Sequence, residues 1–249
     1  MFLDRLATSA AWRWRLWAWG DELRVGGKRL RRDPVLTSPV VLKLVALGRY
    51  EKPERDLLAH MAQAGLIGPG DRVVEAGGGL GTVTMAIADL VGDAAVTVFE
   101  PTPRTATALR ENLALNGHSV TVEQAAVVAG DVAEVAFADT SETSSFAVAG
   151  LVDAAAAPTR IVVPARALSA IVATLDPTVL VLDVEGAEVD LLPSVADWRR
   201  VRAIHLELHP HAVAQGALDA MFAAMAKAGF VRAKIPDFGS HLALLVRAG

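Results

Sequence analysis

A glycine-rich loop holds the first residues of this sequence that could do chemistry. Glu75-Ala76-Gly77-Gly78-Gly79-Leu80-Gly81 places an acid before glycines at alternate positions, 77, 79 and 81. Glycine lets the backbone turn sharply and approach a ligand closely, because it has no Cβ to collide. A helix that follows such a loop points its N-terminus at the same ligand. The loop therefore predicts a nucleoside-binding site where a strand ends at Glu75.

The spacing of the glycines separates two kinds of cofactor. A dinucleotide fingerprint needs Gly-x-Gly-x-x-Gly, and counted from Gly77 its last position is Thr82 rather than glycine. Glu100 ends the next predicted strand, where a carboxylate can accept hydrogen bonds from two ribose hydroxyls. The pattern therefore favours a nucleoside cofactor that is not a dinucleotide.

A second acidic motif, Asp183-Val184-Glu185-Gly186-Ala187-Glu188, follows a continuous apolar run at 178–182. Such a run is typical of a strand that is buried on both faces. The strand expected at 203–208 has period-two alternation, which places His205, Glu207 and His209 on one face. Ligands bind beyond the carboxyl ends of parallel strands, so both segments are expected at the same site as the loop.

The elements that must position these residues alternate between strand-like and helix-like patterns from residue 50 onward. Pro53 opens one helix, 82–91 forms the next, and Pro103 begins a third that ends at Asn116-Gly117. The predicted fold is α/β, with a doubly wound, mostly parallel seven-stranded sheet whose last strand is antiparallel. Its strands are expected at 72–75, 95–99, 119–123, 178–182, 203–208, 230–235 and 241–246.

Two regions depart from this alternation. Residues 1–49 are rich in tryptophan and arginine, which suits a lid, an extension that packs on the core, or an oligomer contact such as that of a homodimer. Residues 50–249 form the main predicted domain, with a β-rich insertion near 125–176. Within that insertion we expect strands at 132–138 and 161–163 and a polar loop at 139–145.

Composition narrows the classes of function. A net charge of −4 and an isoelectric point near 5.9 argue against nucleic acid as the partner and favour a small molecule. The absence of cysteine excludes thiolate nucleophiles and cysteine-ligated metals. Neither a secretory signal nor a transmembrane segment is expected, so the predicted location is cytoplasmic.

The order of these motifs resembles that of the FkbM family of methyltransferases. The resemblance covers about residues 50–247 and rests on the following segments of the chain: Tyr50-Glu51, the glycine loop, Phe99-Glu100-Pro101, Asn112 to Gly117, 183–188 and Leu206-Glu207-Leu208-His209-Pro210. It implies a Rossmann-like class I methyltransferase fold, S-adenosylmethionine as cofactor, and O-methylation of a hydroxyl on a natural product or sugar. The cofactor-binding residues implied are Tyr50, Glu75, Gly77, Gly79, Gly81, Thr82, Glu100, Pro101, Ala125, Ala126 and Asp183.

Three positions depart from the family's usual pattern. Gly79 stands where asparagine is common, Glu75 where aspartate is common, and Val181 where a lysine commonly precedes the acidic motif. The first two changes preserve the logic of cofactor binding. The third puts in doubt any catalytic role that relies on that lysine.

Transfer to an alcohol needs a base, and Asp183, Glu185 and His209 are the candidates. His209 is attractive because its unperturbed pKa of about 6.5 lies near neutrality, although it also suits a purely structural role at a strand end. A divalent metal bound by Asp183, Glu207 and His209 is an alternative that we do not expect. Glu188 is expected to be a solvated first-turn residue, and His60, His118 and His241 show no partner pattern.

Two other functions stay open on the sequence alone. One is an NAD-type oxidoreductase, which the glycine spacing disfavours. The other is a non-catalytic, methyltransferase-like interaction protein that uses its tryptophan-rich N-terminus.

Overall fold

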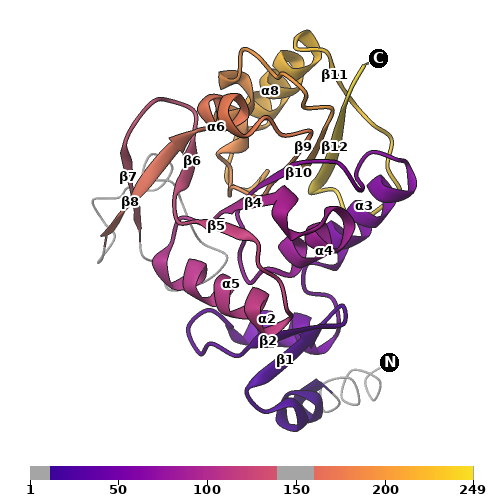
Figure 1. Cartoon of the computed structure of the whole chain (residues 1–249), viewed down its shortest axis with the longest axis vertical. Helices are drawn as coiled ribbons and strands as arrows, with labels where there is room; N and C mark the ends of the chain where they lie inside the picture. The colour runs from indigo at the N-terminus through magenta and orange to yellow at the C-terminus, as the bar shows by residue number, and fades with distance from the viewer. Residues whose placement is uncertain (1–11, 139–159, 249) are drawn as a thin grey trace.

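A seven-stranded sheet forms the centre of the computed structural model, which describes residues 12–138 and 160–248 (Figure 1). All of its strands are parallel except β12, which pairs antiparallel with both of its neighbours. This confirms the mostly parallel sheet and its antiparallel last strand. The loop expected at 139–145 lies outside the described residues. In spatial order the strands are β5 (Thr121–Glu123), β4 (Val96–Phe99), β3 (Val73–Ala76), β9 (Val179–Leu182), β10 (Ala203–Glu207), β12 (Leu242–Arg247) and β11 (Phe230–Arg232).

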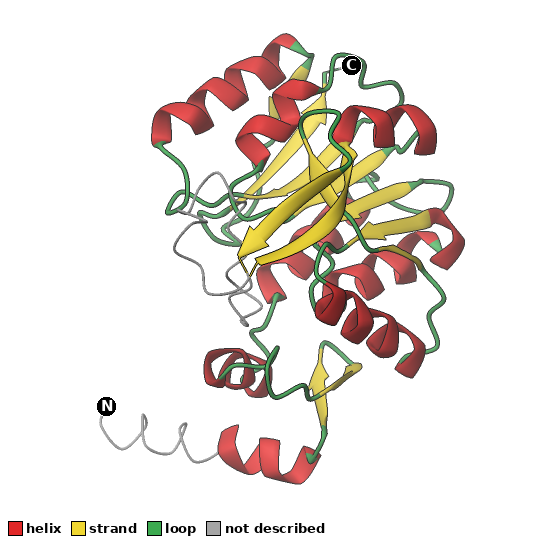
Figure 2. Ribbon diagram, turned by 90° about the vertical axis from the view of Figure 1, so that its left-hand side faces the viewer, coloured by secondary structure: helices red, strands yellow, loops and turns green. Residues whose placement is uncertain are grey.

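Helices cover both faces of the sheet (Figure 2). Strand β3 shows why, because its successive residues Val73 and Val74 belong to two separate apolar clusters, one on each face. The cluster around Val73 includes α3 (Lys52–Gln63), α4 (Thr82–Val91) and α5 (Pro103–Leu115). The cluster around Val74 includes α6 (Leu168–Leu175), α7 (Glu188–Leu191) and α8 (Gln215–Lys227). Two short 3₁₀ turns, Asp93–Ala95 and Leu192–Ser194, complete the elements around the sheet.

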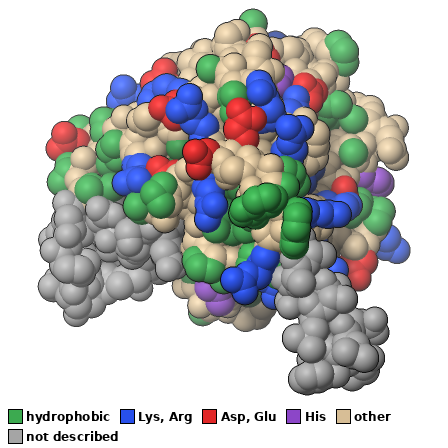
Figure 3. Space-filling model, turned by 90° about the horizontal axis from the view of Figure 1, so that it is seen from below, with side chains coloured by type: hydrophobic (Ala, Val, Ile, Leu, Met, Phe, Trp, Pro, Cys, Tyr) green, Lys and Arg blue, Asp and Glu red, His purple; other side chains and the backbone are tan. Residues whose placement is uncertain are grey.

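The N-terminal region forms a helix at 12–19, a hairpin of β1 (Glu22–Val25) and β2 (Lys28–Arg31), and α2 (Pro39–Ala46). The hairpin contacts α4 and α5: the backbone N–H of Arg31 donates to Asn112 Oδ1 at 2.8 Å, and Lys28 Nζ lies 2.7 Å from an Asp89 carboxylate oxygen. Viewed from below, this side shows apolar side chains among lysine and arginine (Figure 3). Trp14 and Trp17 remain 68% and 75% exposed.

A small second sheet occupies the segment that the sequence predicts to be β-rich. Its strands are β6 (Ala126–Val128), β8 (Arg160–Ala167) and β7 (Glu134–Ala138), in that spatial order. Strand β8 is longer than the expected 161–163. Neither β6 nor α6 is predicted from the sequence. No helix in the described ranges is both long enough and apolar enough to cross a membrane.

An ion pair and a hydrogen bond link the residues that precede three central strands, at the end of the sheet opposite the candidate site. Asp71, just before β3, accepts hydrogen bonds from Arg202 Nη2 at 2.7 and 2.9 Å and from Thr178 Oγ1 at 2.7 Å. Thr178 precedes β9 and Arg202 precedes β10. These bonds fix where the three strands begin relative to one another. The parallel register then aligns their carboxyl ends as well.

Candidate functional site

The register of the central strands brings the chemistry-bearing residues to one level. Ala76 of β3 pairs with Phe99 of β4 and with Leu182 of β9. The residues that follow these three are Gly77, Glu100 and Asp183, so all three emerge side by side from the sheet. Backbone bonds continue the ladder past the strand ends, because Gly77 N donates to Phe99 O at 2.9 Å and Asp183 N donates to Ala76 O at 2.9 Å.

The glycine loop is restricted mainly by the protein around it. At Gly77 a Cβ would lie 1.9 Å from the backbone oxygen of Asp183, and at Gly81 it would lie 2.7 Å from Leu109 Cδ1. Both glycines have left-handed φ angles, +92° and +90°. At Gly79 the nearest atom to a Cβ would be 3.6 Å away, which is ordinary contact. A Cβ at Gly78 would likewise lie 2.6 Å from Val98 and Leu109, so glycine lets the loop pack against the end of β9, against β4 and against α5.

Glu100 lies across the opening of this loop. Its Oε2 accepts a hydrogen bond from Gly79 N at 3.1 Å, and its Oε1 accepts bonds from the backbone and hydroxyl of Thr102 at 3.1 and 3.0 Å. The side chain is almost fully buried, and burial raises the pKa of its carboxyl. Both carboxylate oxygens are therefore oriented by the loop that would surround a ligand.

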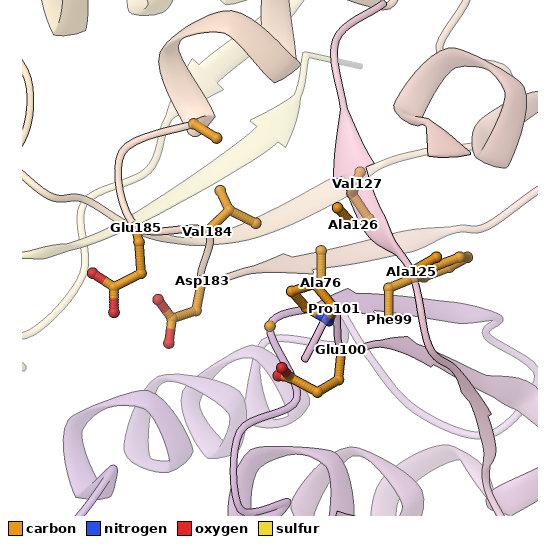
Figure 4. Close-up of a pocket in the computed structure, with 12 residues that line it drawn as sticks. Ala76, Phe99, Glu100, Pro101, Ala125, Ala126, Val127, Asp183, Val184 and Glu185 are labelled. Atoms are coloured by element: carbon orange, nitrogen blue, oxygen red, sulfur yellow. The ribbon is translucent and has the colours of Figure 1, made fainter. Parts of the chain in front are cut away.

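A pocket with about 500 Å³ of empty space, part of it open to solvent, lies between β3, β4 and β9 (Figure 4). Figure 4 shows Asp183 and Glu185 on one side of this donor pocket and Ala125, Ala126 and Val127 on the other. The second side is apolar, which suits a flat aromatic ring. Other predicted residues in the lining are Gly77, Glu100 and Pro101.

His209 lies among three carboxylates beside the donor pocket. Its Nε2 is 3.4 Å from Asp183 Oδ1 and 3.5 Å from Glu185 Oε2, and its Nδ1 is 3.5 Å from Glu188 Oε1. The structure therefore brings the three predicted base candidates together. The prediction of a solvated Glu188 is wrong: its side chain is fully buried and accepts hydrogen bonds from Gly186 N and His209 N at 2.8 and 2.9 Å.

These contacts shift the pKa values of the group in opposite directions. Burial acts to lower the pKa of His209, but the carboxylates of Glu188 and Glu185 outweigh it, so this pKa is raised. Burial acts to raise the pKa of Glu188, but its bonds with His209 leave it lowered. Desolvation and the neighbouring carboxylates of Glu207 and Glu185 hold the pKa of Asp183 well above its ordinary range.

Residues from the start of α3 also reach the site, and the sequence assigned a role to only one of them, Tyr50. Thr82 Oγ1 donates a hydrogen bond to Glu51 Oε2, while Arg55 Nη1 donates to Thr82 Oγ1 at 3.0 Å and to Tyr50 O at 2.7 Å. Burial raises the pKa of Glu51. Helix α3 packs against a face of the sheet, so the rule that ligands bind at the carboxyl ends of strands cannot locate Glu51 or Arg55. Glu51 nevertheless adjoins Tyr50 in the quoted motif.

Two residues of the site have a strained backbone conformation. Four non-glycine residues in the described ranges have positive φ, and two of them, Glu51 at +46° and Glu185 at +52°, belong to the site. A left-handed glutamate costs on the order of 1 kcal/mol or more, which the surrounding contacts must offset. The surrounding fold therefore holds Glu51 and Glu185 in these left-handed conformations.

Glu207 belongs to a different cluster from the one that the sequence suggested. Within the described ranges, one candidate metal-binding group contains Asp183, Glu185 and His209, and the other contains Glu54, Glu207 and His241. The predicted trio of Asp183, Glu207 and His209 is therefore wrong in its grouping. His241, expected to lack a partner, has its Nε2 3.2 Å from Glu54 Oε1.

Glu75 provides a test of the site's electrostatics through stability. Its side chain is 1% exposed, and burial together with the carboxylates of Glu51 and Glu100 raises its pKa to about 8. Between about pH 4.5 and pH 8 the folded protein keeps a proton on Glu75 that the unfolded chain has already released. The free energy of unfolding therefore falls as pH rises through this range. We expect Glu75→Gln to reduce this fall by roughly 3 kcal/mol, measured as the free energy of unfolding in urea without cofactor at pH 5 and pH 8.5.

At pH 5 the free energy of unfolding of the Glu75→Gln variant should be within about 1 kcal/mol of that of the original protein, because the side chain at 75 is then neutral in both folded proteins. An equally steep loss of stability in the variant between pH 5 and pH 8.5 would contradict the raised pKa of Glu75.

Comparison with known families identifies the class of protein that this fold and site define. Residues 76–244 match the model described as the methyltransferase FkbM domain. The match spans more than half of the chain, which therefore belongs to the FkbM methyltransferase family. This membership also argues against the NAD-type oxidoreductase. A search of the curated proteins returns no match.

Solved structures with a similar arrangement have low sequence identity to this chain. Magnesium protoporphyrin IX methyltransferase from Synechocystis PCC 6803, solved with bound SAM, is 14% identical with a TM-score of 0.49, and the alignment covers 85% of each chain. TYW2 from M. jannaschii, solved in complex with AdoMet, is 13% identical with a TM-score of 0.44, and the alignment covers 91% of this chain and 86% of that one. A likeness at this level does not indicate a substrate.

Proposed function

We propose that this protein transfers the methyl group of S-adenosylmethionine to a hydroxyl group of a small molecule. The observation that carries the proposal is the position of His209, within 3.5 Å of Asp183 and Glu185, both of which line the donor pocket. A base at the edge of a nucleoside pocket is what an alcohol acceptor requires, since its proton must be removed as the new bond forms.

The residues of the donor pocket fit this cofactor. Glu100 carries two oriented carboxylate oxygens for the ribose hydroxyls, and the strip from Ala125 to Val127 offers an apolar surface for the adenine ring. Glu75 Oε2 is buried and has no hydrogen-bond partner in the described structure, and Glu51 lies close enough to raise its pKa. Carboxyl groups whose charged forms lack a partner suit a ligand with a sulfonium and an ammonium group, because such a cation favours their ionisation.

When bound, S-adenosylmethionine supplies an electrophilic methyl group on a sulfonium that leaves as a neutral thioether. The chain's own work is to align the acceptor and to accept its proton. His209 Nε2 takes the hydroxyl proton, and the resulting imidazolium is stabilised by Glu185 on one side and Glu188 on the other. Glu188 acts as a positioning residue, because it also accepts the backbone N–H of His209.

The position of the transferred methyl group tests the proposal. The protein would be incubated with S-adenosylmethionine labelled in its methyl group and with panels of alcohols, amines and thiols of matched size. Mass spectrometry and nuclear magnetic resonance of the products should place the label on oxygen. Label found only on nitrogen, sulfur or carbon would contradict the proposed acceptor class.

A further inference from the structure

A second pocket lies next to the donor pocket and is lined by carboxylates. It encloses about 340 Å³ of empty space, partly open to solvent, on the α3 side of β9 and β10. Its acidic lining residues are Glu51, Glu54, Glu75, Asp183 and Glu207.

Two of these lining residues, Glu54 and Glu207, lie close to a third side chain, His241. Ligand atoms of Glu54, Glu207 and His241 all lie within 4.8 Å of one another, which allows one ion to contact all three. They come from α3, from the end of β10 and from the residue before β12, so the fold itself brings them together. Two carboxylates and an imidazole form a ligand set that suits divalent transition metals better than Mg²⁺ or Ca²⁺, which prefer oxygen alone.

Unpartnered buried atoms give an independent sign that a ligand belongs in this pocket. Glu54 is 8% exposed, and its Oε2 has no hydrogen-bond partner within the described structure. His205, which is 2% exposed and lines the same pocket, has an unpartnered Nδ1. Leaving such atoms without a partner costs on the order of 1–3 kcal/mol each, and more when the group is charged.

We propose that Glu54, Glu207 and His241 form a binding site for a divalent transition metal ion. The site is separate from the trio of Asp183, Glu185 and His209, in which both ring nitrogens of His209 lie within 3.5 Å of carboxylate oxygens. Asp183 lines both pockets, so an ion at the proposed site would lie close to the reacting groups. The site does not depend on the identity of the methyl acceptor.

Manganese binding to the full chain tests this site without any methyl transfer. Mn²⁺ would be titrated into the metal-free protein, with no cofactor present, and free Mn²⁺ would be followed by electron paramagnetic resonance. We expect one bound ion per chain, and at least a tenfold weaker affinity in both Glu207→Gln and His241→Gln. His241 is partly exposed, so its variant should fold even if Glu207→Gln does not.

The matched control is Glu185→Gln, which removes a carboxylate from the other trio and should leave Mn²⁺ affinity within about twofold. Thermal unfolding of each variant would confirm that it is folded. The proposal is overturned if no stoichiometric binding occurs at millimolar Mn²⁺, or if Glu185→Gln abolishes binding while His241→Gln does not. Because methyl transfer plays no part in the readout, this result is independent of the proposed function.

Discussion

Replacing His209 with glutamine should lower the turnover rate of methyl transfer by about 10²- to 10⁴-fold, the usual contribution of a positioned general base. Glutamine keeps hydrogen-bonding capacity but cannot take up the acceptor's proton. In the original protein the rate should rise with pH through the pKa of His209, which its carboxylate neighbours hold above the ordinary histidine value. The variant should lose this dependence on pH.

His211 provides the matched control for this experiment. It is exposed, and its ring centroid lies 5.8 Å from that of His209. His211→Gln should therefore keep a turnover rate within about twofold of the original and should keep the rise with pH. If His209→Gln retains both the rate and the pH profile, the proton must go to another group, and Asp183 becomes the next candidate.

Replacing Gly77 with alanine should destabilise the fold by about 2–5 kcal/mol. The added Cβ would overlap the backbone oxygen of Asp183 at 1.9 Å, and an alanine at φ +92° carries a further conformational cost. The free energy of unfolding in urea would measure this loss, and S-adenosylmethionine binding should be lost with it. Because backbone rather than a flexible side chain blocks the Cβ, β3 and β9 must separate to admit it.

Gly92→Ala isolates the conformational part of this cost. Gly92 has nearly the same φ, +86°, but no atom lies within 4 Å of its Cβ position. Its ψ of 146° lies outside the αL region, so alanine there should lose about 1–3 kcal/mol. Equal stability of the two variants would show that the contact between the loop and Asp183 does not restrict the residue at 77. A Gly77→Ala variant that fails to fold, beside a folded Gly92→Ala variant, supports the expected difference.

The parts of the fold with strong local signals could be predicted from the sequence. The helix expected at 82–91 is α4 with the same bounds, because Gly81 and Gly92 both have the left-handed φ that interrupts helical backbone. The apolar run at 178–182 predicts a strand buried on both faces, and β9 is buried at every position. Strand ends then placed Gly77, Glu100 and Asp183 together.

The misses have a common physical cause, which is packing between elements that are distant in sequence. Glu188 was assigned to solvent because a first-turn acid usually faces water, yet here it lies under His209 and accepts its backbone N–H. The alternation in β10 correctly put Glu207 on the face of His205, but it could not show that α3 brings Glu54 to that face. Patterns in a single sequence show which face of a strand or which end of a helix a residue occupies. Which side chains it contacts depends on how distant elements pack in the folded protein.

Binding of S-adenosylmethionine to the Glu100→Ala variant is the measurement that tests the account's central claim most directly. If Glu100 holds the ribose hydroxyls, calorimetry should show a loss of about 1.5–3 kcal/mol, or roughly 10- to 150-fold in affinity. Glu111→Ala on α5 is the control, since it removes the same charge at an exposed position 3.8 Å from Arg31 and should bind as the original does. Unchanged affinity in Glu100→Ala would contradict the assignment of this pocket to the methyl donor.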